Sequence, residues 1–141
     1  CLVGSEMCIR DSSYRDEYKT AFLTHFEKCL ELNPSYYMAF QGLNNYYYSL
    51  KDYDNVIKLN RKTINAGGYE YNFEYNNHIA KAHYMQQQLD SCKHYLELTI
   101  NEIDLAIQQG DDPNGQLAQK RAGIMNQLNQ VNQSLSNPSS N

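Results

Sequence analysis

Membrane-spanning segments and basic patches are both missing from this sequence. No apolar run approaches the roughly 18 residues that a membrane span needs. Lysine and arginine total 12 against 16 acidic residues, and they stand mostly singly along the chain. Clustered positive charge is the usual mark of a protein that binds nucleic acid. The sequence therefore predicts neither a membrane span nor a nucleic-acid partner.

Recognisable catalytic and metal-binding motifs are missing as well. His78, His83 and His94, together with Cys92, match no zinc pattern such as paired C-x-x-C or H-E-x-x-H. No serine or cysteine lies in a nucleophile motif. The two glycines at residues 67–68 are not followed by the Lys-Ser/Thr of a phosphate loop. We therefore expect no catalytic residue, no metal and no cofactor.

Cysteine offers no disulfide framework. Two of the four cysteines lie in the first eight residues, and the others, Cys29 and Cys92, fall at helix positions that need a small buried residue. The units that carry them are too far apart in the repeat described below for the roughly 7 Å that a disulfide allows. We expect two small core hydrophobes, and this cysteine usage slightly favours a reducing, cytoplasmic compartment.

The first dozen residues fit nothing downstream. Residues 2–11 resemble, residue for residue, one reading frame of a transposase adapter used in DNA library preparation. We expect residues 1–12 to be a non-native segment that belongs outside fold and function reasoning. The chain from residue 13 is then expected to be a fragment cut inside a repeat array. The alternative is a natural, flexible N-terminus.

What the sequence does contain is a pattern that recurs at a spacing close to 34 residues, with two extra residues before the third copy. Three positions of one helix correspond: Phe22 with Val56 and Cys92; Phe26 with Asn60 and Leu96; Cys29 with Thr63 and Thr99. Three positions of a second helix correspond: Leu43 with Ile79; Tyr47 with His83; Tyr48 with Tyr84. Such a period is typical of an α-helical solenoid, whose units bury their apolar faces against one another.

Apolar residues at helical spacing, bounded by turn signals, predict six helices. They span residues 14–32, 36–50, 53–66, 73–87, 89–109 and 116–135, followed by a polar tail at 136–141. Pro34 ends the first helix, because proline disfavours the α conformation in the residue before it. Ser35 is the expected N-cap of the second helix. Gly67 and Gly68 end the third, and residues 110–115 are the strongest break.

These repeated residues resemble the tetratricopeptide repeat. The central copy supplies the family's aromatic, leucine, tyrosine, turn and small positions, which are Phe40, Leu43, Tyr47, Asp52, Tyr53, Val56 and Thr63. Residues 29–34 are very like the family's ending, and the resemblance covers residues 14 to about 104. Asn44 and Asn60 depart from it, because the family has a small and a large apolar residue there. A buried amide at either position needs a hydrogen-bond partner.

The resemblance implies an all-α fold, a right-handed solenoid of antiparallel helix pairs. Its repeats would occupy residues 13–109, as a half unit at 14–34 and full units at 36–66 and 73–109. The helix at 116–135 would cap the open end, since terminal units need a polar outer face. A coiled-coil dimerisation helix is the alternative for this last segment.

The resemblance also implies a function, because the family binds protein or peptide segments in a concave groove lined by the first helix of each unit. The groove candidates are polar or aromatic side chains that do not face the core: Gln41, Asn45, Tyr48, Asn77, Lys81 and Tyr84. Asparagine amides can hold a peptide backbone, and tyrosines bind with little entropy loss. Only Asn45 and Lys81 fit the set with which some members clamp a C-terminal carboxylate. An ordinary solvated helix face is the alternative.

We therefore expect a protein- or peptide-binding scaffold without catalysis. One rival is a regulatory or sensor module severed from a larger enzyme or signalling protein, and another is a structural spacer in a longer array. Because the first copy lacks its first helix, the face that carries Phe22 and Phe26 is expected to be partly uncovered. Exposed aromatic surface promotes association, so self-association through the first helix is a further expectation.

Overall fold

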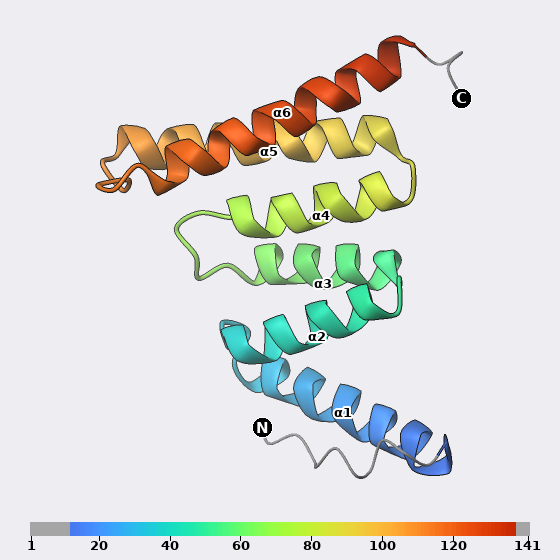
Figure 1. Cartoon of the computed structure of the whole chain (residues 1–141). Helices are drawn as coiled ribbons and strands as arrows, with labels where there is room; N and C mark the ends of the chain where they lie inside the picture. The colour runs from blue at the N-terminus through green and yellow to red at the C-terminus, as the bar shows by residue number, and fades with distance from the viewer. Residues whose placement is uncertain (1–11, 138–141) are drawn as a thin grey trace. The chain divides into compact units, whose positions relative to one another are not determined.

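A computed structural model describes residues 12–137 of the chain, and every element in that range is a helix (Figure 1). The six helices are α1 (Ser12–Leu32), α2 (Tyr37–Ser49), α3 (Tyr53–Ala66), α4 (Phe73–Met85), α5 (Leu89–Gln108) and α6 (Gln116–Ser136). The predicted all-α class is therefore confirmed. The predicted adapter segment, apart from its last residue, lies outside the described range.

Helix ends follow the turn signals closely. Helix α1 ends at Leu32, directly before the Asn33–Pro34 pair, and α3 ends at Ala66 because Gly67 takes a φ of 71°, which side-chain-bearing residues rarely adopt. The predicted N-cap at Ser35 is wrong. Tyr36 occupies that position without a side-chain cap, while the Asn33 Oδ1 accepts a hydrogen bond of 3.1 Å from the Ser35 N–H. The asparagine side chain therefore stabilises this turn.

The described residues form two compact units, which meet at the turn between Lys51 and Asp52. In the first unit, α1 packs on α2 through aromatic side chains. The Phe22 ring centroid lies 4.5 Å from that of Phe26 and 5.1 Å from that of Tyr46. Phe26 is buried and Phe22 half-buried, so only Phe22 retains part of the uncovered surface expected of this face.

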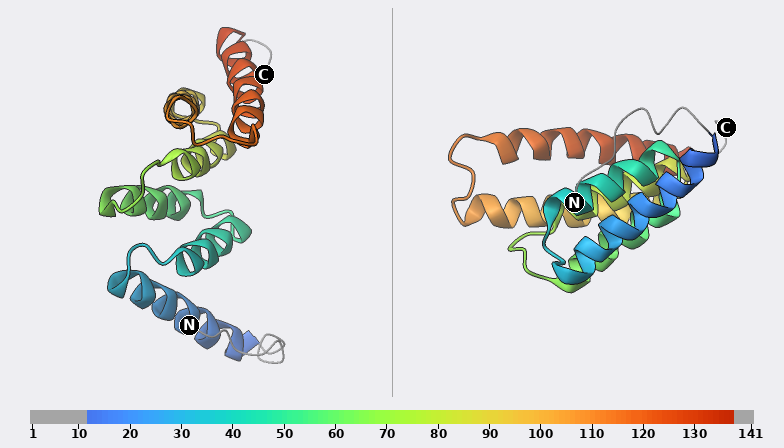
Figure 2. Two further views of the ribbon diagram at one scale, coloured as in Figure 1. Left: turned by 90° about the vertical axis from the view of Figure 1, so that its left-hand side faces the viewer. Right: turned by 90° about the horizontal axis from the view of Figure 1, so that it is seen from below.

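In the second unit, α3, α4, α5 and α6 pack one on the next, and α5 and α6 lie side by side in all views (Figures 1 and 2). The core joins three of these helices. Its buried members are Ala80, Cys92, Leu96, Ile100, Ile103, Ile124, Leu128 and Val131.

Cys92 is a free, buried thiol, as predicted. Cys29 is only half-buried and is disulfide-bonded, so the interpretation as a core hydrophobe is wrong for that residue.

Corresponding positions of α3 and α5 have the same burial. Val56 and Cys92 are buried, as are Asn60 and Leu96, and Thr63 and Thr99. The two threonines also form the same kind of hydrogen bond. Each hydroxyl donates to the carbonyl four residues earlier in its own helix, at 2.9 Å in α3 and 2.7 Å in α5. The Asn60 amide donates in the same way to the Val56 carbonyl, at 2.8 Å. Both threonine hydroxyls and the amide nitrogen of Asn60 thus donate to the backbone of their own helix.

Helix α6 is stabilised by hydrogen bonds at its N-terminus and by an ion pair with α5. The Asp112 carboxylate accepts hydrogen bonds from the N–H groups of Leu117 and Ala118, at 2.9 and 3.0 Å, which satisfies two donors of the first turn. The Arg121 guanidinium forms two contacts with Asp104 of α5, at 2.5 and 3.1 Å.

Among the described residues, no helix is both long and apolar enough to cross a bilayer.

Candidate binding surfaces

Three of the predicted groove residues lie on α2, in the first unit. Gln41, Asn45 and Tyr48 are spaced by four and three residues and therefore share one face of the helix. Gln41 and Asn45 are exposed, and Tyr48 is half-buried. The face thus presents two amides and part of one phenol to solvent.

The other three predicted residues lie on α4, in the second unit. Asn77, Lys81 and Tyr84 have the same spacing and share one face. Lys81 is exposed and Tyr84 is 54% exposed, but Asn77 is only 8% exposed. The Asn77 Oδ1 is covered and has no hydrogen-bond partner among the described residues. The accessible part of this face is therefore Lys81 and Tyr84, and Asn77 lies beneath it.

A second surface, which the sequence reasoning missed, is a pocket of about 610 Å³ between α3, the end of α4 and the turn into α5. The α3 residues that line it are Asp54, Ile57, Lys58, Arg61, Lys62 and Asn65, and the others are His83, Gln86 and Gln88. The sequence signal was present, because Lys58 precedes the Arg61–Lys62 doublet by one helical turn and all three fall on one face. The Arg61–Lys62 doublet alone is too short to indicate a binding site.

A stacked cluster supports this pocket. The ring of His83 lies flat on the ring of Tyr95 of α5, with centroids 5.5 Å apart and planes inclined by 18°. The Arg61 guanidinium carbon is 5.7 Å from the centroid of the same tyrosine. Its Nε and Nη2 donate to the Tyr95 hydroxyl at 3.1 and 2.9 Å. Tyr95 therefore connects α3 with α4 and fixes the position of a cation at the pocket.

Two polar atoms in the pocket lining lack hydrogen-bond partners among residues 12–137. His83 is 8% exposed; its Nδ1 lies 2.6 Å from the Gln88 Oε1, whereas its Nε2 has no hydrogen-bond partner. Gln86 donates from Nε2 to Asp54 at 2.6 Å, while its Oε1 is buried and unpaired. Buried polar atoms are nearly always hydrogen-bonded in folded proteins. Two unpaired atoms in one lining therefore indicate a place where a ligand or water supplies the missing bonds.

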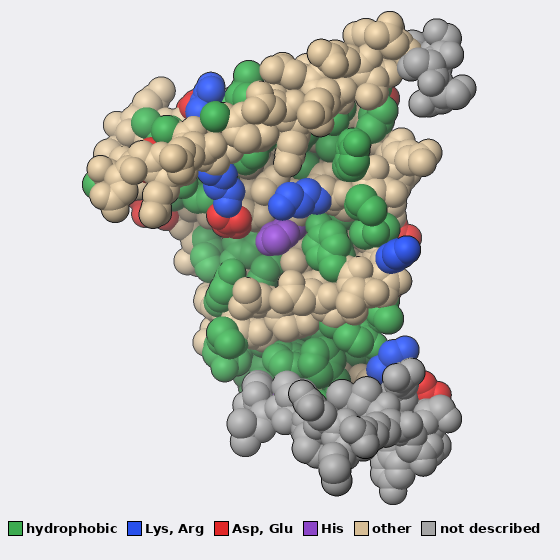
Figure 3. Space-filling view, viewed as in Figure 1, with side chains coloured by type: hydrophobic (Ala, Val, Ile, Leu, Met, Phe, Trp, Pro, Cys, Tyr) green, Lys and Arg blue, Asp and Glu red, His purple; other side chains and the backbone are tan. Residues whose placement is uncertain are grey.

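The face of α4 near α6 has a different character. Glu74 is paired with Lys120 of α6, and burial lowers the pKa of the nearby His78, with the charge of Lys81 acting in the same direction. Figure 3 shows a histidine between acidic and basic side chains on the side of the molecule that it presents. Opposite charges alternate here, so this face offers no field of a single sign.

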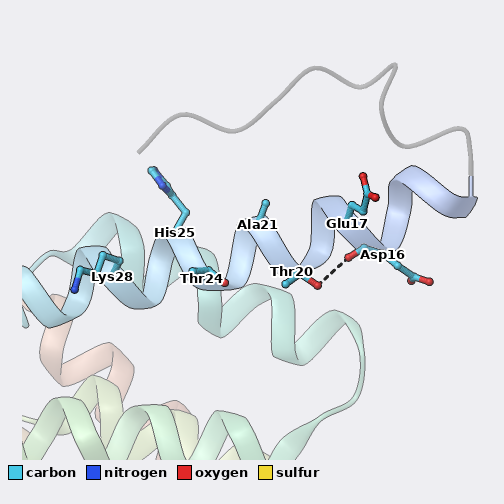
Figure 4. A pocket seen from close by; sticks show the side chains of 7 residues that line it. All are labelled: Asp16, Glu17, Thr20, Ala21, Thr24, His25 and Lys28. Carbon is cyan, nitrogen blue, oxygen red and sulfur yellow. Dashed lines mark hydrogen bonds between the residues drawn. The ribbon is translucent and has the colours of Figure 1, made fainter.

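A hollow along α1 has no comparable content. Its lining comes from one helix face alone: Asp16, Glu17, Thr20, Ala21, Thr24, His25 and Lys28 (Figure 4). The Thr20 hydroxyl donates to the Asp16 carbonyl at 3.0 Å, so its hydrogen bond is internal to the helix. With no second described element to enclose it, this row of side chains is an ordinary exposed helix face.

The surroundings of Cys92 limit its reactivity as a nucleophile. Burial raises the pKa of the Cys92 thiol to about 11, which keeps it protonated at neutral pH. No group of three or more His, Cys, Asp or Glu side chains in residues 12–137 is arranged to hold a metal ion. His83, one of the histidines considered for a metal site from the sequence, packs against Tyr95.

Comparisons of the chain with protein-family models, with curated proteins and with solved structures give no match. The assignment of function therefore depends on the surfaces described above.

Proposed function

We propose that this chain is a non-catalytic scaffold that binds a protein or peptide segment through the exposed face of α4 in the second unit, and that the exposed face of α2 in the first unit is a separate surface of the same kind. The observation that carries the proposal is the exposure of Tyr84, at 54%, on the same face of α4 as the exposed Lys81. A tyrosine held on a helix offers a large contact area at low entropic cost, and the lysine supplies a charge for an acidic partner. The equivalent face of α2 adds two exposed amides, at Gln41 and Asn45.

The architecture that we propose is a right-handed solenoid of tetratricopeptide type, with α6 as its capping helix. The matched burial of α3 and α5 supports it, because the same three positions face inward in both helices. The equal hydrogen bonding of Thr63 and Thr99 supports it too. For α6, the outer residues Gln119, Gln127, Gln130 and Gln133 are exposed, as a terminal cap requires.

Selection of binders from a displayed peptide library tests the proposed function. Peptides selected on the whole chain are expected to lose about tenfold or more in affinity for a Lys81→Ala/Tyr84→Ala variant, since truncation of a central aromatic residue typically costs more than 1 kcal/mol. The matched control is Lys19→Ala/Leu32→Ala, which removes an exposed lysine and an exposed large apolar side chain from α1, outside the proposed faces. The same loss of peptide affinity in both variants, or no loss in either variant, would contradict binding through this face.

A further inference from the structure

The pocket beside His83 supports an inference that is independent of peptide binding. We propose that this pocket, at the junction of α3, α4 and the start of α5, binds a phosphate group through Lys58, Arg61, Lys62 and His83. The shared chemistry is that of a phosphoryl group, whether it is free phosphate or a phosphate monoester.

The charge in the pocket matches such a ligand. Lys58, Arg61 and Lys62 contribute three positive charges and Asp54 one negative charge, which leaves a local charge of +2 on a chain whose formal charge is −4. Within residues 12–137, none of the three cations forms an ion pair with a carboxylate. A phosphoryl group carries a charge of about −1.5 to −2 at neutral pH. The pocket and the ligand would therefore neutralise each other.

The cations of the pocket are arranged before any ligand binds. Lys58 stands one helical turn before the adjacent Arg61 and Lys62, and all three lie on one face of α3. Arg61 is held through Nε and Nη2 by the Tyr95 hydroxyl, so its Nη1 donors are left for a ligand. A side chain that is already fixed loses less entropy when the ligand binds.

His83 distinguishes phosphate from other anions. Its unpaired Nε2 is either a donor or an acceptor, according to where the ring carries its proton. A phosphate group near neutral pH can itself carry a proton, because its second pKa is about 6. One proton shared between Nε2 and a phosphoryl oxygen therefore makes a hydrogen bond in either state. Sulfate has no proton at neutral pH and would need the histidine to supply it.

Nuclear magnetic resonance of the histidine rings tests this proposal on the whole chain. Inorganic phosphate is added at constant ionic strength, and saturable shifts are expected at the His83 ring but not at His25 or His94. Because Nε2 is covered in the free structure, the His83 signals also report the side-chain movement that uncovers it. Sulfate is the control anion and is expected to bind several-fold more weakly. O-Phosphoserine is the monoester probe.

Substitution assigns the signal to the cations. Lys58→Gln/Lys62→Gln is expected to weaken phosphate binding about tenfold or more, since two charge-assisted contacts are lost. Lys19→Gln/Lys93→Gln makes the same change in net charge elsewhere and is expected to leave binding within about twofold. Circular dichroism of both variants is measured first, and an unchanged spectrum shows that the helices are retained.

Each outcome decides the proposal. Saturation by inorganic phosphate and by phosphoserine supports a site for the phosphoryl group itself, and saturation by phosphoserine alone supports a site for a monoester. Absence of a saturable His83 shift with either probe overturns the proposal. Equal affinity for sulfate, or equal loss of binding in the two double variants, overturns it too, because the site would then respond to ionic charge alone.

Discussion

The ring of His83 stacks on the ring of Tyr95, with their planes inclined by 18° and their centroids 5.5 Å apart. This contact joins α4 to α5 at the pocket, and the hydroxyl of the same tyrosine accepts two hydrogen bonds from Arg61 of α3. One side chain thus connects three consecutive helices.

The two roles of Tyr95 can be separated by substitution. Tyr95→Phe keeps the stacked ring and removes the acceptor, so we expect a loss of about 0.5 to 1 kcal/mol in unfolding free energy, at the low end for such a bond because Arg61 is exposed. Tyr95→Ala also removes the ring and is expected to cost at least about 2 kcal/mol. Urea denaturation followed by circular dichroism measures both. Equal losses would mean that the ring contributes nothing.

Gly42 tests the packing of α1 on α2. A Cβ at this position would lie 3.1 Å from Cε1 of the buried Phe26 ring, which leaves the ring little room. Gly123 in α6 has nothing within 4 Å of such an atom and is the matched control. Gly123→Ala is expected to stabilise the protein by about 0.5 to 1 kcal/mol, as alanine does in an open helix site.

Gly42→Ala is expected to lose that gain and about 1 kcal/mol more, because the ring must shift. Chemical denaturation of both variants provides the comparison. A Gly42→Ala protein as stable as the Gly123→Ala protein would show that α2 does not approach Phe26 as closely as described.

Asp112 tests the start of α6. Its carboxylate accepts from two backbone N–H groups of the first turn, so Asp112→Ala is expected to cost about 1 kcal/mol of stability and to increase hydrogen exchange at Leu117 and Ala118. Asp112→Asn retains one oxygen acceptor and is expected to recover part of the loss. Unchanged exchange at these two amides in the alanine variant would contradict the cap.

Tyr71 gives a prediction for alkaline pH. Its hydroxyl donates to Asp111 at 2.5 Å, and this hydrogen bond is the main reason that its pKa is raised from 10.0 to about 12. The folded state therefore holds the phenolic proton more tightly than the unfolded state does. The stabilising contribution is complete below pH 10 and is lost as the pH rises toward 12.

Ultraviolet titration of tyrosinate checks this assignment. The difference between the wild-type and Tyr71→Phe curves should show one phenol that ionises later than an ordinary tyrosine. In Asp111→Asn the late step is expected to move back toward pH 10, since the carboxylate is removed. A late step that persists in Asp111→Asn would assign it to another residue.

Helix positions could be predicted from the sequence because they depend on local signals. Proline at residue 34 and glycine at residue 67 end their helices where expected, and α3 has the bounds that its apolar spacing predicts. The cap of α2 could not be predicted in the same way. Ser35 and Asn33 are both common turn residues, and the asparagine formed the hydrogen bond.

The pocket could not be predicted because its lining comes from α3, from α4 and from the turn that leads into α5. The cations of α3 are visible in the sequence, but the partners of His83 lie at Gln88 and Tyr95, and only packing brings them to the same place. The burial of Asn77 was missed for a related reason. Helical spacing gives the direction in which a side chain points, whereas its coverage depends on neighbouring helices.

The narrow buried stripe of α6 has a practical consequence. Only Ile124, Leu128 and Val131 of this helix are buried, and Gln127 and Gln130 between them are exposed. A cysteine introduced at either glutamine would carry a fluorophore or a surface-immobilisation handle on the outer side of the helix. Such an attachment would leave the lining of the pocket beside His83 untouched, because none of its residues lies on α6.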